Sequence, residues 1–128
     1  MATISLSSLF KELIGDETIE ELREKLEWER RILYTVLDHL PSSIYVKDHE
    51  ARKIVANKAN YTQAGFVKAS DVIGKTDFEM FPRHLAEKFY EDDCKVLKKG
   101  ETITNRVEQV ISTDGVERWQ VTEKYPIY

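Results

Sequence analysis

The chain has 128 residues, of which 41% are hydrophobic and 33% charged, and its formal net charge is −4. These values predict one globular domain with a short appendage, and the negative charge argues against broad electrostatic binding to nucleic acid or anionic membranes. No apolar run approaches the roughly 20 residues that a membrane-spanning helix needs, no secretory signal pattern begins the chain, and the single cysteine, Cys94, excludes an internal disulfide. We therefore expect a cytoplasmic protein.

A capped helix is predicted before Pro41. Thr18 and Glu21 have the spacing of a capping box, and a shorter apolar segment over residues 5–14 precedes them. The apolar stripe of the capped helix follows a three-four alternation that Glu29 interrupts, and it comprises Ile19, Leu22, Leu26, Leu33, Val36 and Leu40. We assign residues 1–40 to this helical segment. Its stripe either packs on its own domain or forms a coiled-coil homodimer, and the two interpretations are compatible.

The remaining residues, 41–128, alternate between strand and helix patterns. The predicted elements, in order, are strands over 44–47 and 53–56, helices over 58–64 and 82–99, and strands over 102–112 and 116–127. Asn57 is placed to cap the first of these helices, and Gly100 follows the second at a position that favours glycine.

The last two strands are joined at Asp114-Gly115, which is a strong signal for a short hairpin turn. With a two-residue loop, Val110 faces Trp119 and Val107 faces Thr122. Apolar residues then fall on both faces of the hairpin, so we expect both faces of the sheet to be covered.

The stretch from Val72 to Pro82 predicts a strongly kinked segment between two longer elements. Gly74 permits a turn, and Thr76 or Asp77 can cap a short helical turn, a role that we expect of Asp77. The large apolar side chains of this turn are Phe78, Met80 and Phe81. Such a segment usually forms one wall of a small core or pocket.

Several short motifs occur in an order and spacing that resemble those of a PAS domain. They are Ile44-Tyr45-Val46-Lys47-Asp48, Asn57-Lys58-Ala59-Asn60-Tyr61, Gly65-Phe66, Asp93-x-x-Val96-x-x-x-Gly100, and Asp114-Gly115 followed by Arg118-Trp119. The resemblance covers about Leu37 to Tyr128 and is to the branch common in bacterial and archaeal sensor proteins. It implies an α+β fold with a PAS-like antiparallel sheet and short helices on one face. The domain then spans residues 41–128, and the N-terminal amphipathic helix precedes it.

The resemblance also implies a fifth strand between the first and the fourth, for which the sequence up to Tyr128 has no segment. We therefore expect a truncated or split chain in which those two strands present unpaired backbone edges. Residues 3–9 are an alternative occupant of that slot.

No catalytic or metal-binding constellation is present in the sequence, because His39, His49 and His84 lack metal-ligand spacing. A regulatory domain is therefore expected rather than an enzyme. Light-sensing flavin relatives carry a cysteine in an Asn-Cys-Arg-Phe motif, where this chain has Lys75-Thr76-Asp77-Phe78. Haem-binding relatives carry a histidine in the middle of the long helix, where this chain has Phe89. Haem and flavin are disfavoured, and no cofactor is expected.

The resemblance places a candidate ligand pocket between the inner sheet face and the middle helices. Its candidate lining residues are Tyr45, Tyr61, Phe66, Phe78, Phe81, Phe89, Asp93, Val110 and Trp119. The same aromatic set equally suits a filled core. Asp93 lies centrally on the apolar face of its helix, so we expect it to be more than half buried and paired with a lysine or arginine of the sheet, with a nearby backbone donor, or with a polar ligand atom.

Two functions from different classes fit these features. The first is a sensory input domain that homodimerises, binds a small molecule and relays a conformational change to an output domain outside this sequence. The resemblance implies outputs such as the histidine kinase of a two-component system, a cyclic-dinucleotide enzyme or a transcription regulator. The second is a constitutive dimerisation or scaffold domain without a ligand. A haem or flavin redox sensor is a third alternative.

Overall fold

The computed structural model describes residues 5–8, 15 and 17–128. The chain divides into two units, Met1–Val36 and Leu37–Tyr128. Residues 6–8 are helical, and residues 9–14 of the helix predicted over 5–14 lie outside the described residues. The described part of the stretch 3–9, residues 5–8, forms no strand, so it does not fill the slot between the first and the fourth strand, while residues 3, 4 and 9 lie outside the described residues.

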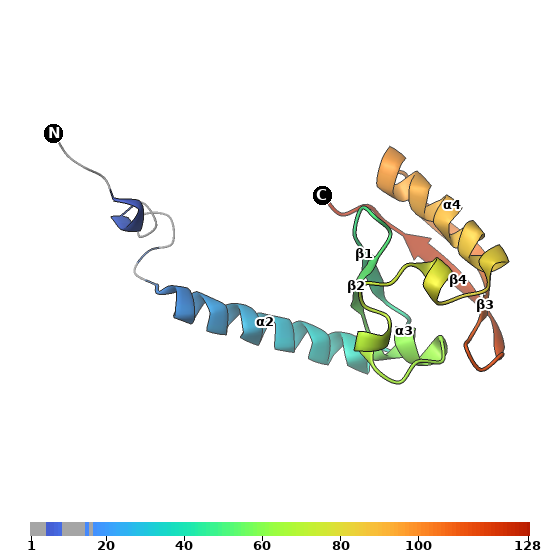
Figure 1. The fold of residues 1–128 in the computed structure, drawn as a ribbon, viewed down its shortest axis with the longest axis horizontal. Helices are drawn as coiled ribbons and strands as arrows, with labels where there is room; N and C mark the ends of the chain where they lie inside the picture. Colours follow the sequence, from blue (N-terminus) through green and yellow to red (C-terminus); the bar gives the residue numbers. More distant parts are fainter. Residues whose placement is uncertain (1–4, 9–14, 16) are drawn as a thin grey trace. The chain divides into compact units, whose positions relative to one another are not determined.

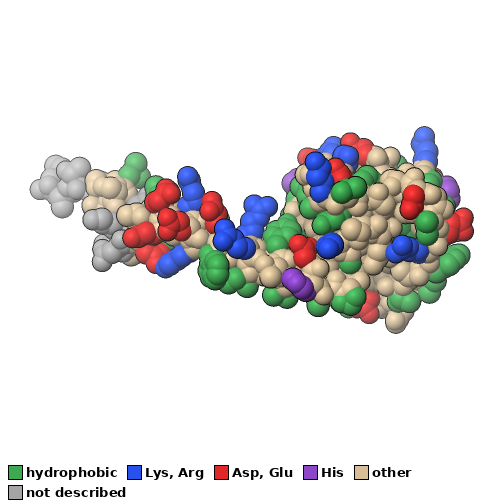
Figure 2. Space-filling view, turned by 90° about the horizontal axis from the view of Figure 1, so that it is seen from below, with side chains coloured by type: hydrophobic (Ala, Val, Ile, Leu, Met, Phe, Trp, Pro, Cys, Tyr) green, Lys and Arg blue, Asp and Glu red, His purple; other side chains and the backbone are tan. Residues whose placement is uncertain are grey.

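Helix α2 spans Ile19–His39, which confirms the capped helix. Both bonds of the capping box are formed, since the Thr18 amide donates to Glu21 Oε2 over 2.9 Å and the Glu21 amide donates to Thr18 Oγ1 over 3.1 Å. No residue of α2 is buried. Leu26 is 66% exposed and Leu33 is 52% exposed, so the apolar stripe lies at the surface, where Figure 2 shows hydrophobic side chains interspersed with charged ones.

The second unit follows the predicted order of elements (Figure 1). These are β1 (Tyr45–Lys47), β2 (Lys53–Ala56), α3 (Lys58–Gln63), the 3₁₀ turns η1 (Ala69–Asp71) and η2 (Asp77–Glu79), α4 (Arg83–Lys99), β3 (Ile103–Ile111) and β4 (Glu117–Lys124). Strand β1 pairs antiparallel with β2, and β3 pairs antiparallel with β4. Within the described residues, no ladder joins the two hairpins. The fold is α+β, as expected.

Asn57 organises the region where the chain enters the domain. Its Oδ1 accepts hydrogen bonds from the amides of Asn60, which it caps, and of Ile44, over 3.0 and 2.9 Å. Its Nδ2 donates to the carbonyl oxygens of Leu37 and Ser42 over 2.8 and 2.9 Å. The side chain is fully buried, so its two polar atoms are satisfied by four backbone groups. The side-chain amide of Asn57 therefore links the last turn of α2, the segment that leads into β1, and the N-terminus of α3.

The β3–β4 hairpin differs from the predicted register by one residue. Val110 lies opposite Arg118 and Val107 opposite Val121, so the predicted pairing is wrong. The register shifts because the loop has three residues instead of two. The Ser112 amide donates a hydrogen bond to Val116 O across this loop, and Gly115 within it has φ +83°. One extra loop residue shifts the pairing by one position for residues 117–122 of β4, which moves their side chains to the opposite face relative to their predicted partners.

The core lies between the strands and the helices of the second unit. Ala56, Val72 and Met80 are buried together, and Tyr61 and Phe66 pack against them. Helix α4 contributes a separate buried face that includes Leu85, Ala86, Phe89 and Val96, and it contacts η2 and β3 (Figure 1). Among the described residues, no helix is both long and apolar enough to cross a membrane.

Candidate functional site

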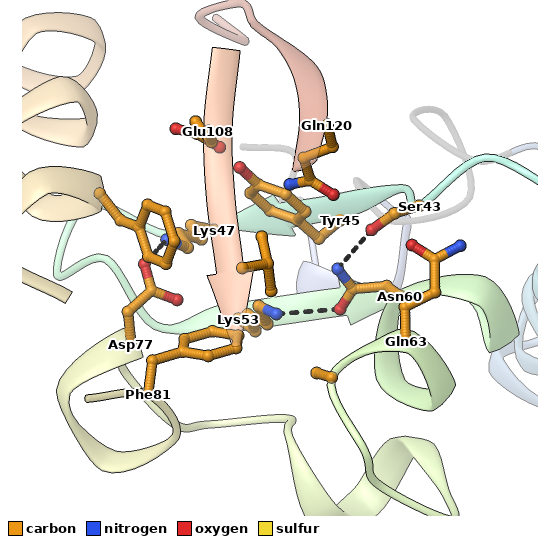
Figure 3. Close-up of a pocket in the computed structure, with 13 residues that line it drawn as sticks. Ser43, Tyr45, Lys47, Lys53, Asn60, Gln63, Asp77, Phe81, Glu108 and Gln120 are labelled. Atoms are coloured by element: carbon orange, nitrogen blue, oxygen red, sulfur yellow. Dashed lines mark hydrogen bonds and ion pairs between the residues drawn. The ribbon is translucent and has the colours of Figure 1, made fainter. Parts of the chain in front are cut away.

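A small cavity of about 50 Å³ lies between the inner strand faces and the helices. Its walls come from both hairpins, from α3 and α4, and from the segment around η2 (Figure 3). The lining residues are Ser43, Tyr45, Lys47, Lys53, Asn60, Gln63, Ala64, Asp77, Phe81, Phe89, Glu108, Val110 and Gln120. Aromatic and charged groups therefore line the same partly open cavity.

A buried charge network stands on one side of this cavity. Lys47 Nζ lies 2.5 Å from both Asp77 Oδ2 and Asp93 Oδ2, and Lys124 Nζ lies 2.7 Å from Asp93 Oδ1. Each of the four side chains is less than a tenth exposed. Two cations and two carboxylates balance in charge, which is the condition under which buried ions are tolerated.

This network tests the sequence-based predictions for Asp93 and for Asp77. Asp93 is 4% exposed and pairs with lysines of β1 and β4, so the predicted burial and pairing are confirmed. The prediction that Asp77 caps a helical turn is wrong. Thr76 occupies the cap position of η2, and the Asp77 carboxylate turns inward to Lys47, because a buried cation offers a stronger partner than exposed amides do.

The network also changes the acidity of its neighbours. Burial alone would lower the pKa of Lys47, but Asp77 and Asp93 outweigh burial and raise that pKa, so Lys47 stays charged. Burial raises the pKa of Tyr45 well above its ordinary value, and the nearby Asp93 carboxylate adds to this effect. The Tyr45 hydroxyl is therefore neutral throughout the physiological range.

Lys53, on β2, is buried without such compensation. It is 3% exposed and donates from Nζ to Asn60 Oδ1 over 2.9 Å, while Asn60 Nδ2 donates to Ser43 Oγ over 2.8 Å (Figure 3). Its ammonium forms no ion pair with any described residue. Burial lowers the pKa of Lys53 to about 8 against the partial opposition of Asp77.

Four of the nine predicted pocket residues line this cavity: Tyr45 from β1, Phe81 after η2, Phe89 from α4 and Val110 from β3. Phe81 and Phe89 meet edge to face with ring centroids 5.5 Å apart. These side chains provide the apolar part of the cavity wall.

The other predicted pocket residues lie elsewhere. Tyr61 and Phe66 pack against the core, and Asp93 belongs to the charge network. Phe78 is 46% exposed and meets the ring of Tyr90 at 5.6 Å. Trp119 is 69% exposed on the outer face of β4, because the hairpin register places it opposite Gln109.

Sequence reasoning missed the polar half of the cavity. The sequence pattern places Lys53 and Asn60 only in a strand and a helix, and it places Glu108 and Gln120 only in the hairpin. One signal was available, because Tyr45 and Lys47 are two residues apart on a short strand and must share a face. A lysine on the inner side of a strand requires a buried carboxylate nearby, and Asp93 was already identified as one.

A second, much larger hollow separates β1 from the end of β4. This groove has a volume of about 1190 Å³ and is lined along one side by residues 42–49 and along the other by residues 123–128, with Val96 and Leu97 of α4 also in its wall. The expectation that β1 and β4 present edges unpaired with each other is confirmed for the described residues.

Among the described residues, no group of three or more His, Cys, Asp or Glu side chains is arranged to hold a metal ion. Cys94 is half-buried on α4 and carries no disulfide. The site is therefore defined by the cavity, the charge network and Lys53.

Residues 37–128 match the family model described as the PAS fold, and the chain belongs to this family. It is 34% identical over 90 residues to the uncharacterized protein y4lL of Sinorhizobium fredii, a match that covers 70% of this chain and 10% of that protein. A structure of VqmA bound to DPO matches with a TM-score of 0.65 and 27% identity, covering 73% of this chain and 47% of VqmA.

A second structure, of a Vibrio cholerae VqmA dimer in the absence of target DNA, matches with a TM-score of 0.64 and 28% identity, over 73% of this chain and 41% of that one. The chain thus spans about a tenth of its curated relative and less than half of VqmA.

Proposed function

We propose that this chain is the sensory input domain of a signalling protein in the cytoplasm, and that it binds a small molecule in the cavity between strands and helices. The observation that carries the proposal is Lys53, a buried cation that faces the cavity without a carboxylate partner among the described residues. A filled structural core has little reason to retain such a group, whereas a ligand site uses a few placed polar groups among aromatic walls.

The relatives support this proposal. PAS domains are in general regulatory rather than catalytic, and VqmA, which shares the fold, has been solved with DPO bound. A change of cavity packing would be relayed to an output domain, such as a kinase, a cyclic-dinucleotide enzyme or a transcription regulator. VqmA is described as a DNA-binding receptor of the LuxR type, which makes a transcription regulator one reasonable output.

We further propose that the protein is a homodimer through the stripe of Ile19, Leu22, Leu26, Leu33, Val36 and Leu40. The helix is 21 residues long, about three heptads, and helices in proteins gain most of their stability by packing an amphipathic face against a partner. Leu22 is half-buried and the other five side chains are exposed, which leaves apolar surface to be covered on both sides of the exposed Glu29. VqmA is also described as a dimer.

A constitutive dimerisation domain without a ligand is the second candidate, and the size of the cavity favours it. Small-molecule pockets usually have volumes of about 300–1,000 Å³. A cavity of about 50 Å³ is far below that range. Only a ligand of few heavy atoms fits without rearrangement. The sensory domain and the constitutive dimerisation domain therefore differ in whether such a ligand occupies the cavity.

We propose that neither haem nor flavin is the ligand. Both are many times larger than the cavity, and Phe89 stands in its wall where haem-binding relatives carry a histidine. The visible absorption spectrum of the purified protein tests this directly, because either cofactor would give a strong band.

Native mass spectrometry tests the proposed function. The intact protein is expected to have the mass of two chains plus one small ligand in each chain, and the denatured chain is expected to have the mass of its sequence alone. A dimer without additional mass would favour the constitutive dimerisation domain, and a monomer would refute the proposed dimer.

A further inference from the structure

The ammonium group of Lys53 has hydrogen-bonding capacity that the protein does not use. An ammonium carries three N–H donors. Asn60 Oδ1, 2.9 Å away, accepts one of them, and Ser43 holds Asn60 in the orientation that presents this oxygen. No other acceptor bonds to Nζ among the described residues. Two N–H donors therefore remain for a ligand in the cavity that Lys53 lines.

The neighbouring carboxylates are already engaged. Asp77 and Asp93 both bond to Lys47, and Asp93 also bonds to Lys124. Glu108 lines the cavity but accepts a hydrogen bond of 2.7 Å from Thr122 and forms no ion pair with Lys53. A buried cation without a counter-ion is unfavourable in a low-dielectric interior, so an anion that enters the cavity would be stabilised there.

Aromatic faces limit the shape of such an anion. Lys53 Nζ lies 5.2 Å from the ring centroid of Tyr45 and 5.9 Å from that of Phe81, within cation–π range of both. Phe89 and Val110 complete the apolar wall. A volume of about 50 Å³ admits only a few heavy atoms, and the Glu108 carboxylate would repel a second negative charge.

We propose that the cavity binds a short-chain monocarboxylate, whose carboxylate oxygens accept hydrogen bonds from Lys53 Nζ and whose carbon chain lies against Phe89 and Val110. This inference rests on the proposed ligand-binding function and names the chemical class of the ligand. Dicarboxylates are disfavoured because of Glu108, and neutral amides of the same shape lack the charge that Lys53 would compensate.

Binding of this anion depends on pH. The charged groups around Lys53 are Lys47 of β1, Asp77 of η2, Asp93 of α4 and Glu108 of β3, and Tyr45 stays neutral. Because the pKa of Lys53 is about 8, the ammonium is charged at pH 7 and loses its proton above pH 8. The affinity for the carboxylate therefore falls as the pH rises through 8 to 9, and binding at pH 8.5 takes up a proton.

Isothermal titration calorimetry with sodium acetate at pH 7 tests the proposal, with acetamide as the neutral probe of the same shape. Wild-type protein is compared with Lys53→Met and with Lys88→Met, which removes one exposed charge from α4. Acetate is expected to bind wild type and Lys88→Met equally, and at least tenfold more weakly to Lys53→Met. Acetamide is expected to bind none of the three.

Two results would overturn the proposal. Acetate binding that is absent in wild type, or equal in wild type and Lys53→Met, would refute the carboxylate site. Binding of acetamide as tight as that of acetate would show that charge does not select the ligand. In either case the proposed sensory function is judged separately, by the mass of any ligand that copurifies with the wild-type dimer.

Discussion

Lys47 and Lys53 lie beside the same tyrosine ring, with Nζ at 5.3 and 5.2 Å from the centroid of Tyr45, yet their electrostatic environments differ. Lys47 is held between Asp77 and Asp93, whereas Lys53 bonds to a neutral amide oxygen. Breaking the network around Lys47 leaves a buried charge without its partner, whereas removing Lys53 eliminates a buried charge that has none. We therefore predict opposite effects on stability.

Replacing Asp93 with alanine is predicted to destabilise the protein by about 3–5 kcal/mol, because Lys124 loses its carboxylate and Lys47 loses one of two. Urea denaturation followed by circular dichroism measures the change. Glu91→Ala is the matched control on the same helix, since Glu91 is exposed and lies 3.9 Å from Lys95. A denaturation midpoint that Asp93→Ala leaves unmoved would show that the network does not form.

Replacing Lys53 with methionine is predicted to leave stability unchanged or to raise it at pH 7. Methionine fills similar space without a charge, and leaving the buried Asn60 oxygen without its donor costs about 1–3 kcal/mol. The drop in the pKa of Lys53 from 10.5 to about 8 corresponds to about 3 kcal/mol by which its folded environment, chiefly burial, disfavours the charged form. A clear loss of stability in Lys53→Met would mean that the ammonium has a protein partner in solution.

The pH dependence of the same variant gives an independent check. The folded-state pKa of Lys53 is lower than its unfolded-state value, so the unfolded chain binds more protons between about pH 8 and 10.5 and wild-type stability rises across this range. Lys53→Met lacks this contribution. The stability of Lys53→Met relative to wild type is therefore predicted to be highest below pH 8 and to fall towards pH 10. A stability difference that does not change with pH would contradict the lowered pKa of Lys53.

At the scale of elements, α2 carries an apolar stripe and no buried residue. Replacing Leu26 and Leu33 with aspartate is predicted to convert the dimer into a monomer, because charges at both positions would lie in the proposed interface. Analytical ultracentrifugation measures the result. Arg23→Asp with Arg30→Asp has the same seven-residue spacing outside the stripe and is expected to remain dimeric. A dimer that survives the leucine substitutions would place the interface elsewhere.

The groove between β1 and β4 leads to a prediction about their backbone. Amides of β1 and β4 that face the groove have no strand partner in the described residues, whereas those in the β1–β2 and β3–β4 ladders do. Hydrogen exchange followed by NMR is predicted to be fast for the first set and slow for the second. Slow exchange on both edges would mean that a strand from another copy or another segment fills the groove in solution.

For the molecule as a whole, the sequence predicted what depends on local chemistry. The capping box at Thr18, the Asn57 cap and the order of elements were all confirmed, because each follows from neighbouring residues. The hairpin register was not predictable from Asp114-Gly115, since the loop uses one residue more than the tightest turn does. The role of Asp77 was also missed, because its partner Lys47 lies 30 residues away in the sequence.

The proposed occupancy of the cavity by a small molecule is tested by a variant that fills the cavity with a larger side chain. Val110→Phe places a larger side chain in the cavity wall, whereas Val107→Phe makes the same change on the exposed face of β3, where valine is 64% exposed. Native mass spectrometry is predicted to show a copurified small molecule on wild type and Val107→Phe, and none on Val110→Phe. Wild-type protein without additional mass, or Val110→Phe that retains it, would contradict the claim.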